Sequence, residues 1–380
     1  MLEPGQPIEG RRPDRFRPPH CPWKDCPDHT PTKRYRCSRQ GSYVRKCDSR
    51  RRVPRYRCPS CQRGFSRQSY AASYYLKRPE LLEPVAAGLV AGSAHRQLAR
   101  SLGCAPSTVT RLSARLGRHS LLVQAEALVE LDASVDEPFV FDHFETFVFS
   151  QDDRLAIGTP VGRHSWFVYG LDPAPHRRAG RRSARRAARI RPLPEPVEQT
   201  FVHSTRRVLG MLGRLAPLGF RLISDDHPAY RTAAADRRID HEIHANPPRG
   251  DGVDPVRTVK RDQQMFAVDL LHKLLRHSQA HHRRETIAFG RRSNAVLERI
   301  ALMVVWRNFV KRVSERRNDA ETPATRVGVA ARLWSWGDVL ARRRFPGLVR
   351  LPEGWSTIYR RGWITPAVGR NLPHAPVYAY

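Results

Sequence analysis

The sequence predicts an α/β protein in which a domain of mixed strands and helices follows a small cysteine-rich module and a short helical domain. Three observations support this. Six of the seven cysteines lie within residues 20–66, apolar residues recur at helical spacing over residues 79–126, and a strand-like aromatic pattern begins at residue 138. At 380 residues the chain has the length of two or three compact domains.

The charge balance points to a polyanionic partner. There are 67 Lys and Arg against 36 acids, a net charge of +31, which makes nucleic acid the leading candidate. The longest strongly apolar run, residues 300–306, is far shorter than the roughly 20 residues of a membrane-spanning helix. The N-terminus has Arg and Pro where a secretory signal needs an apolar stretch. We therefore expect a cytoplasmic protein with reduced cysteines, for which metal ligation is favoured over disulfides.

Residues 1–19 read as a flexible basic lead-in, and residues 20–70 as a zinc-ribbon module. Cys21 and Cys26 bracket four residues, and Cys58 and Cys61 bracket two. Two such knuckles supply the four thiolates of a tetrahedral structural Zn²⁺ site. The alternative is a set of ordinary buried thiols. Cys37 and Cys47 could replace a knuckle member or be free, and the sequence leaves this open.

Residues 79–126 read as a helix-turn-helix domain. In the run SAHRQLARSLGCAPSTVTRLSARLGRH, Ala99 would allow two helices to approach, Gly103 would take the turn, and Val109 with Leu112 would face inward. Ser107 would cap the second helix. The side chains expected to contact DNA are Ser107, Thr108, Thr110, Arg111 and Arg115. The alternative is a helical hairpin that binds no ligand.

The remaining chain, residues 130–316, mixes strand and helix patterns. We expect three consecutive strands over residues 138–171, broken at 150–153 and 158–163, and further strands at 220–224 and 239–245. Helices are expected at 196–215, 263–280 and 294–313. The Arg-dense insert 176–192 is either a solvated linker or a DNA-backbone contact. Residues 317–380 form a basic, Trp- and Pro-rich tail.

Three acids stand in contexts suited to metal-dependent phosphodiester chemistry, which uses two divalent ions held by carboxylates from different elements. Asp142 lies within the aromatic strand FVFDHFETFVF, and Asp225 ends the apolar strand of GFRLISDD. Asp269 lies on a helix whose i, i+4, i+7 spacing also presents Lys273 and Arg276. Alternatively, Asp225 shapes a turn and Asp269 forms a surface ion pair. The rival carboxylates are Asp132, Asp136, Glu145 and Glu298, of which Glu298 is the strongest candidate for a third ligand.

These motifs resemble the bacterial insertion-sequence transposases of the DDE type. The likeness covers most of the chain, and it is carried by YRCPSCQRGFS, DHFETF with RHSWFVYGLD, ISDDHPAY, and LRHSQAHHRRETIAFGRR followed by WRNF. The resemblance implies an RNase H-like catalytic domain, a mixed sheet flanked by helices. It also implies two Mg²⁺ ions, double-stranded DNA partners (element ends and target), and a homodimer or higher assembly on the bacterial nucleoid.

The family's site residues fall on positions of this sequence. Its first two metal ligands fall on Asp142 and Asp225, and the third, normally a glutamate seven residues before an arginine, falls on Asp269 before Arg276. Aspartate in place of glutamate is a departure, as is His143 where a second acid often follows the first, and the insert 177–191 has no counterpart that we can place.

Two other functions compete with DNA transposase. A non-catalytic or decayed transposase-derived DNA-binding protein or regulator would use the same front half of the chain, and its three acids would be dispensable. A tyrosine recombinase is suggested by the HxxR spacing of His281 and Arg284, but the next tyrosine after them, the nucleophile this chemistry needs, is Tyr359.

Overall fold

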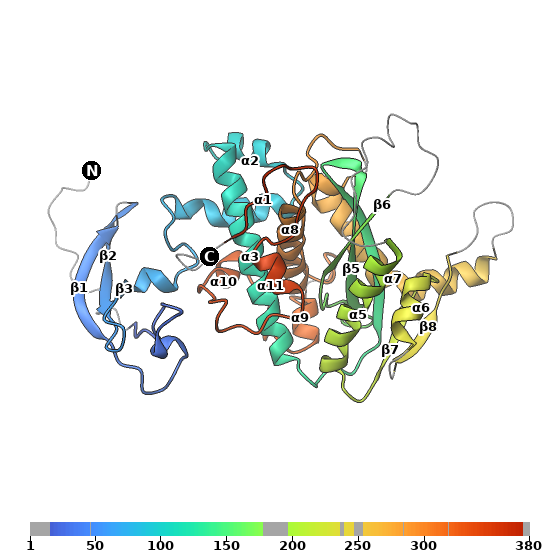
Figure 1. Cartoon of the computed structure of the whole chain (residues 1–380), viewed down its shortest axis with the longest axis horizontal. Coiled ribbons are helices and arrows are strands. Elements are labelled where there is room, and N and C mark those ends of the chain that lie inside the picture. Colours follow the sequence, from blue (N-terminus) through green and yellow to red (C-terminus); the bar gives the residue numbers. More distant parts are fainter. Residues whose placement is uncertain are drawn as a thin grey trace. The chain divides into compact units, whose positions relative to one another are not determined.

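The computed structural model describes residues 16–45, 47–177, 197–235, 239–246, 254–283, 285–317 and 319–374 (Figure 1). Its internal contacts divide the chain into two compact units, which we describe separately. Unit 1 comprises Met1–Pro79 with Leu340–Leu348, and unit 2 comprises Glu80–Val339 with Val349–Tyr380. Most of the Arg-dense insert, residues 178–192, lies outside the described residues. The division of the chain into the five modules 1–19, 20–70, 79–126, 130–316 and 317–380 stays a prediction.

Unit 1 is built on a three-stranded antiparallel sheet in the order β1-β2-β3. The strands are β1 (Ser38–Arg45), β2 (Asp48–Arg57) and β3 (Gly64–Ser66), and short 3-10 turns lie at Pro27–His29 and Arg67–Tyr70. The small core consists of rings at 4.7–6.4 Å centroid separations, contributed by Phe16, His20, His29, Tyr56, Phe65, Tyr70 and Phe345. Such a small core needs a further constraint to be stable alone.

Unit 2 begins at Glu80, within a 3-10 turn (Pro79–Leu81). Three helices follow, α1 (Leu82–Val90), α2 (His95–Ser101) and α3 (Pro106–Glu130). The expected internal contacts of the α2–α3 pair are confirmed, since Ala99, Val109 and Leu112 are buried and Gly103 has a φ of +55°. The expected cap is wrong. Ala105 is the N-cap, without a side-chain bond, and Pro106 occupies the first turn, where its missing N–H costs nothing; Ser107 is therefore already helical.

Helix α3 packs closely against α8 (Ser293–Val305). A Cβ atom on Gly117 of α3 would overlap the backbone of Glu298 on α8. The approach of the two helices therefore depends on glycine at this position.

A Gly117→Ala variant should destabilise the protein by about 1–3 kcal/mol, because the two helices would have to separate. Gly213→Ala is the matched control, because Gly213 also lies in a helix but its Cβ would meet no atom within 4 Å. That variant should gain roughly 0.5–1 kcal/mol from the better helix former. Urea unfolding of both variants tests this, and equal midpoints would contradict it.

The centre of unit 2 is a mixed five-stranded sheet flanked by helices, in the order β6-β5-β4-β7-β8. Its strands are β4 (Phe139–Val148), β5 (Ser150–Gly162), β6 (Asp172–Arg177), β7 (Phe220–Ser224) and β8 (Ile239–Ile243). Central strand β4 is antiparallel to β5 and parallel to β7. The predicted α/β class is confirmed at this level.

The predicted layout of the first three strands is wrong. β5 runs through both expected breaks, and the chain reverses at Phe149, which has a φ of +68°. The third strand begins only at Asp172. In the aromatic run before it, Phe167 and Tyr169 are fully buried in a connection with one bridge to β5. Their apolar pattern therefore reflects burial and not a strand.

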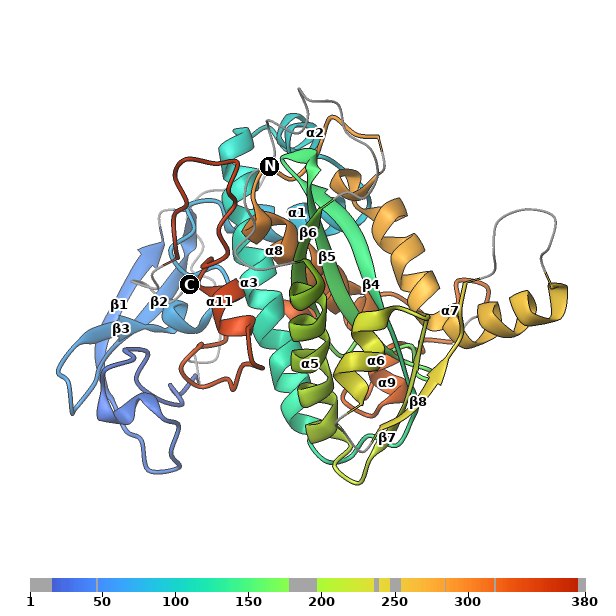
Figure 2. The same ribbon diagram turned by 45° about the vertical axis from the view of Figure 1, so that its right-hand side comes forward.

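Helices cover both faces of the sheet. In Figure 2, α5 (Val197–Leu215) and α6 (Pro228–Ala234) lie in front of the strands, while α7 (Pro255–Ser278) contacts β4, β5 and β7. Helix α7 starts earlier than predicted because the Asp254 carboxylate accepts a hydrogen bond from the Val256 N–H at 2.9 Å and Pro255 follows this cap. A 3-10 turn, Ala280–His282, comes next, and α8 ends in a π-helical turn, Trp306–Val310.

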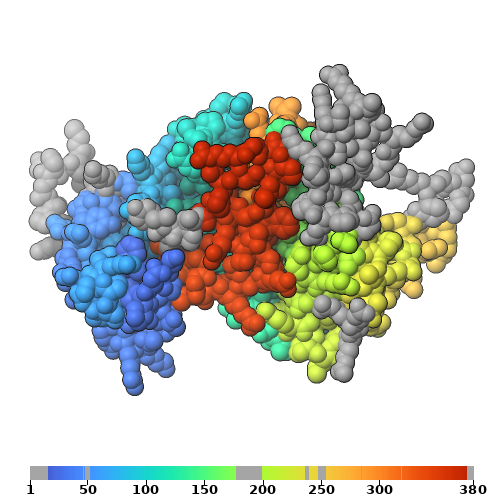
Figure 3. Space-filling model, viewed as in Figure 1, coloured from blue at the N-terminus to red at the C-terminus, as the bar shows by residue number. Residues whose placement is uncertain are grey.

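The described C-terminal residues before Leu340 and after Leu348 are part of the compact unit 2 and do not trail from it as a tail. This segment contains three short helices, α9 (Pro323–Arg326), α10 (Trp336–Val339) and α11 (Trp355–Tyr359). Trp355 is 2% exposed and donates to the Leu171 carbonyl oxygen at 3.0 Å. Figure 3 shows these residues, in red, as a continuous part of the surface. No helix of the described chain is long and apolar enough to cross a membrane.

Candidate carboxylate site and metal centre

The register of the sheet brings two of the predicted acids together. Strands β4 and β7 run parallel, with Phe141 opposite Ser224, so Asp142 and Asp225 are the next residues on adjacent strands. β7 ends at this point whereas β4 continues to Val148. The end of β7 therefore leaves Asp142 accessible to groups from beyond the strand.

The Asp142 carboxylate is held by the backbone and by a tyrosine. Its Oδ1 accepts hydrogen bonds from the His143 N–H at 2.7 Å and from the Tyr230 hydroxyl of α6 at 3.1 Å. On the other side its Oδ2 lies 3.7 Å from His272 Nδ1. The carboxylate is thus oriented through one oxygen, and the second oxygen faces α7.

Asp225 has an oxygen without a protein partner. Its Oδ2 accepts a bond from Asn246 at 3.3 Å, but its Oδ1 is buried and makes no hydrogen bond with the described residues. Buried carboxylate oxygens are normally hydrogen-bonded or bound to a cation. Burial also raises the pKa of Asp225. The geometry therefore suits a cation at this oxygen.

The acids repel one another. Burial, reinforced by the charges of Asp225 and Asp269, raises the pKa of Asp142 to about 7. A carboxyl group of this kind retains its proton near neutral pH unless a cation compensates its charge. The three acids therefore share one electrostatic environment.

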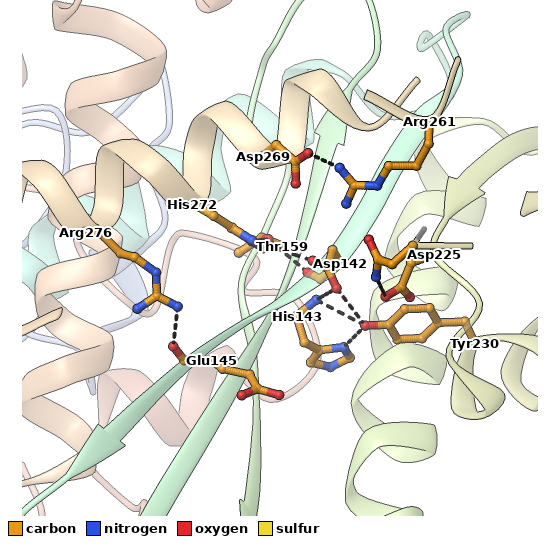
Figure 4. A network of polar contacts seen from close by, with 11 residues as sticks. Asp142, His143, Glu145, Thr159, Asp225, Tyr230, Arg261, Asp269, His272 and Arg276 are labelled. Atoms are coloured by element: carbon orange, nitrogen blue, oxygen red, sulfur yellow. Dashed lines mark hydrogen bonds and ion pairs between the residues drawn. The ribbon is translucent and has the colours of Figure 1, made fainter. Parts of the chain in front are cut away.

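Helix α7 presents Asp269, His272 and Arg276 towards this region (Figure 4). Their i, i+3, i+7 spacing places them on one face. Arg276 donates to the Glu145 carbonyl oxygen at 3.1 Å and lies 4.8 Å over the Phe144 ring. The predicted Lys273 is exposed. His272 takes the place on this face that the sequence analysis gave to Lys273.

The sequence analysis did not identify His272. Its position three residues after Asp269, on the same face of the helix, could have indicated it. Thr159 donates to the Asp142 carbonyl oxygen at 3.0 Å, and its hydroxyl lies 2.9 Å from His272 Nε2. Because the Thr159 proton is already donated, this contact assigns the imidazole proton to Nε2. Burial, with a smaller effect of Arg276, lowers the pKa of His272 to about 3. The unprotonated Nδ1 of a neutral ring therefore faces Asp142.

A second missed residue, Arg261, lies on the N-terminal half of α7. Its guanidinium forms an ion pair with Asp269 and contacts Asp262 at 3.2 Å. Its charge also opposes the rise that burial causes in the pKa of Asp225. Figure 4 shows Arg261 beside Asp269 and Asp225. A fixed protein cation therefore neutralises part of this acidic cluster.

His143 faces the opposite side of the sheet from the acids. Its Nδ1 lies 2.9 Å from the Tyr230 hydroxyl and its Nε2 lies 3.2 Å from the Ser204 hydroxyl of α5. Burial holds the pKa of His143 well below its usual value. A neutral ring at this position supports the packing of α5 and α6, and it is not a further metal ligand next to Asp142.

The strongest of the rival acids, Glu298, is bound by other residues. Glu298 is 1% exposed and is bound by Arg118 of α3 at 2.9 Å and by Arg361 at 3.2 Å, so we do not assign it to the carboxylate cluster. Asp132 and Asp136 precede β4, and Glu145 is exposed. For the tyrosine recombinase, Tyr359 and His281 are each 2% exposed, which suits core residues, and Arg284 lies outside the described residues.

The raised pKa of Asp142 has a consequence for stability. The folded chain keeps the proton up to about pH 7, whereas an unfolded aspartate loses it near pH 4. Between these values the folded state binds more protons, so stability without a divalent cation should fall as pH rises. Asp142→Asn should remove this dependence and make the protein more stable at pH 8. Urea midpoints at pH 5 and pH 8 test this, and a parallel decline in both proteins would contradict it.

Unit 1 contains the predicted cluster of four cysteines. The Sγ atoms of Cys21, Cys26, Cys58 and Cys61 all lie within 4.8 Å of one another, and no other group of three or more ligand residues in the described chain is this tight. The Cys21–Cys61 and Cys26–Cys58 sulfur separations are 3.7 and 3.6 Å. Such a cluster could hold a tetrahedral Zn²⁺ ion. Cys37 and Cys47 lie outside it.

The polar residues of the helix-turn-helix lie at the start of α3. Ser107, Thr110 and Arg111 are exposed, and Thr108 and Arg115 are half-buried. The Thr110 hydroxyl donates to the Pro106 carbonyl oxygen at 3.0 Å and lies 3.1 Å from His95 Nδ1. Thr110 is thus tied to α2, which leaves Ser107 and Arg111 as the most accessible of the five.

No protein-family model matches the chain, and no curated protein matches its sequence. Among solved structures, the chain is similar to one in the intasome of simian T-cell lymphotropic virus in complex with the PP2A regulatory subunit B56 gamma. The identity is 12% and the TM-score 0.25, over 59% of this chain and 62% of that chain. A likeness this weak carries no argument about fold or activity.

Proposed function

We propose that this protein is a DNA transposase of an insertion sequence, a metal-dependent polynucleotidyl transferase that cuts and joins DNA strands. The observation that carries the proposal is that Asp142 and Asp225 directly follow the paired residues Phe141 and Ser224 of two parallel strands, with Asp142 next to His272 of α7. Asp225 Oδ1 is buried without a partner among the described residues, and Asp142 has a pKa of about 7. Both features suit carboxylates arranged for cations rather than for internal pairing.

Asp142, Asp225 and Asp269 would hold Mg²⁺, because this hard cation prefers oxygen ligands. Bound magnesium lowers the pKa of an attacking water or 3′ hydroxyl and stabilises the leaving oxygen of an in-line displacement. The chain's own groups prepare this chemistry. Tyr230 and the His143 N–H orient Asp142, and the neutral His272 ring excludes a competing positive charge next to it.

DNA would be bound by the N-terminal modules. The basic surface of the zinc ribbon and the exposed start of α3 would contact double-stranded element ends, with Ser107, Thr108, Thr110, Arg111 and Arg115 reaching bases and phosphates. Arg276 would assist near the carboxylates. The net charge of +31 supports this partner. We further propose an RNase H-like catalytic domain, a dimer or higher assembly on two DNA ends, and a cytoplasmic, nucleoid-associated location.

One observation favours a second candidate, a DNA-binding protein without catalysis. Asp269 is shorter than the family's glutamate, and it is already neutralised by Arg261. A chain that had lost its third ligand would present such a pair. The same front half of the protein would then serve as a regulator.

Strand transfer distinguishes the two candidates. The full-length protein is incubated with DNA that carries the element's own flanking ends, with and without magnesium. If the protein is a transposase, joined products should form only with magnesium. Binding of those ends in both conditions without any cut or joined product would leave the regulator as the function.

A further inference from the structure

A hollow of about 1290 Å³ lies on the three-stranded sheet of unit 1. We call it the ribbon groove. Its walls come from β1, β2 and β3 and from the segment at residues 74–77. The described lining includes four basic residues and no acid; the basic residues are Arg45, Arg55, Arg57 and Lys77. Its charge therefore suits an anionic occupant.

Two tyrosines of the ribbon groove are exposed to solvent. Tyr43 on β1 is 37% exposed and Tyr75 is 65% exposed. Tyr75 also has a φ of +63°, a left-handed conformation that is unfavourable for a bulky side chain. Its ring stands edge-on to Tyr74 at 4.9 Å. A strained backbone conformation at an exposed aromatic residue tends to mark a functional position.

The cations of the groove differ in what they do. Arg45 donates to Gln68 Oε1 at 3.1 Å and to the Leu76 carbonyl oxygen at 3.4 Å, so it anchors the segment that carries Tyr75. Arg57 donates to the Gln62 carbonyl oxygen at 3.0 Å. Arg55 lies on β2, paired with Ser66 of β3, and is exposed. Arg55 is thus the groove cation best placed to meet a phosphate.

We propose that the ribbon groove binds unpaired nucleotides of a DNA strand, with bases stacked on Tyr43 and Tyr75 and phosphates near Arg55 and Lys77. Aromatic faces bind any base by stacking, which gives affinity without sequence preference. Bases inside a duplex already stack on one another, so this recognition selects unpaired strands. The inference rests on the proposed function in that DNA is the partner, and DNA cutting and joining creates such strands.

The test measures binding of fluorescein-labelled oligonucleotides to the full-length protein by anisotropy, without added magnesium. The probes are a thymidine strand of about 15 nucleotides, an abasic strand of equal length and charge, and a duplex. The wild type should bind thymidine at least about 5-fold more tightly than the abasic strand, since one stacked base accounts for that much. Tyr75→Leu should remove most of this difference, whereas Tyr75→Phe should keep it.

The charge of the groove is tested with a matched pair on one strand. Arg55→Gln should weaken thymidine binding and reduce the salt dependence by about one phosphate contact. Arg52→Gln is the control, because Arg52 is also exposed on β2 but does not line the groove. Equal effects of both variants would show charge attraction without a site.

Two results would overturn the proposal: equal binding of the thymidine and abasic strands by the wild type, or unchanged thymidine binding by Tyr75→Leu. The duplex serves as the control, because its binding should not change in Tyr75→Leu. Asp142→Asn separates this proposal from the proposed function. It should abolish strand transfer and leave oligonucleotide binding intact. Activity that survives Asp142→Asn while Tyr75→Leu loses base stacking would reject the carboxylate mechanism and leave the groove standing.

Discussion

An Asp225→Asn variant is expected to lose magnesium-dependent strand transfer by more than about 100-fold while still binding DNA. Replacing a residue that only hydrogen-bonds to a metal ligand already lowers metal affinity or activity by about 10–100-fold. Asp225 would be a ligand itself, so its replacement should have a larger effect. Asparagine keeps the size of the side chain and can keep the contact with Asn246. It removes the charge that a cation at the buried Oδ1 requires.

The neighbouring acid is the matched control. Asp226 is exposed and forms an ion pair with Arg231 of α6, and exposed pairs contribute little to stability. Asp226→Asn should therefore retain most of the activity. In the same assay Asp269→Asn should resemble Asp225→Asn, whereas Glu298→Gln should lower stability by unpairing Arg118 and Arg361. Equal activity of the Asp225 and Asp226 variants would contradict the catalytic role of the carboxylate site.

A Cys58→Ser variant is expected to unfold unit 1 and leave unit 2 folded. Zinc binding contributes roughly 10–16 kcal/mol to small zinc peptides, which matches or exceeds the whole stability of a typical domain. Unit 1 has only a small aromatic core, so it depends strongly on such a constraint. Residues 16–79 should become sensitive to protease and the bound zinc should be lost.

Cys47→Ser is the control for this prediction, because Cys47 is exposed and lies outside the cluster. It should keep its zinc and its resistance to protease. Zinc content by mass spectrometry and limited proteolysis provide the two measurements. A Cys58→Ser protein with full zinc content and intact unit 1 would show that the four thiols are ordinary core residues.

The sequence predicts best where one local rule governs the chain. The two cysteine knuckles form one cluster, and the apolar run ending at Ser224 is a strand with Asp225 at its end. Periodicity also located α5 and the turn at Gly103. In each case the signal comes from residues close together in the chain.

What the sequence could not supply depends on tertiary contacts. Phe167 and Tyr169 look like strand residues because they are apolar, but they are buried in a connection. Arg261 reaches Asp269 across two helical turns, and His272 meets Asp142 only because α7 crosses β4. The choice between Asp269 and Glu298 likewise depends on α8 packing against α3, which no local pattern specifies.

Whether a divalent cation binds between Asp142 and Asp225 is the central question, and anomalous diffraction from crystals of the full-length protein grown with Mn²⁺ answers it most directly. Manganese accepts the same oxygen ligands as magnesium and can be located by its anomalous signal. The proposed carboxylate metal site predicts a manganese peak in contact with Asp142 and with Oδ1 of Asp225. A difference map without manganese at these carboxylates, with Arg261 still paired to Asp269, would contradict the catalytic assignment and favour the DNA-binding regulator.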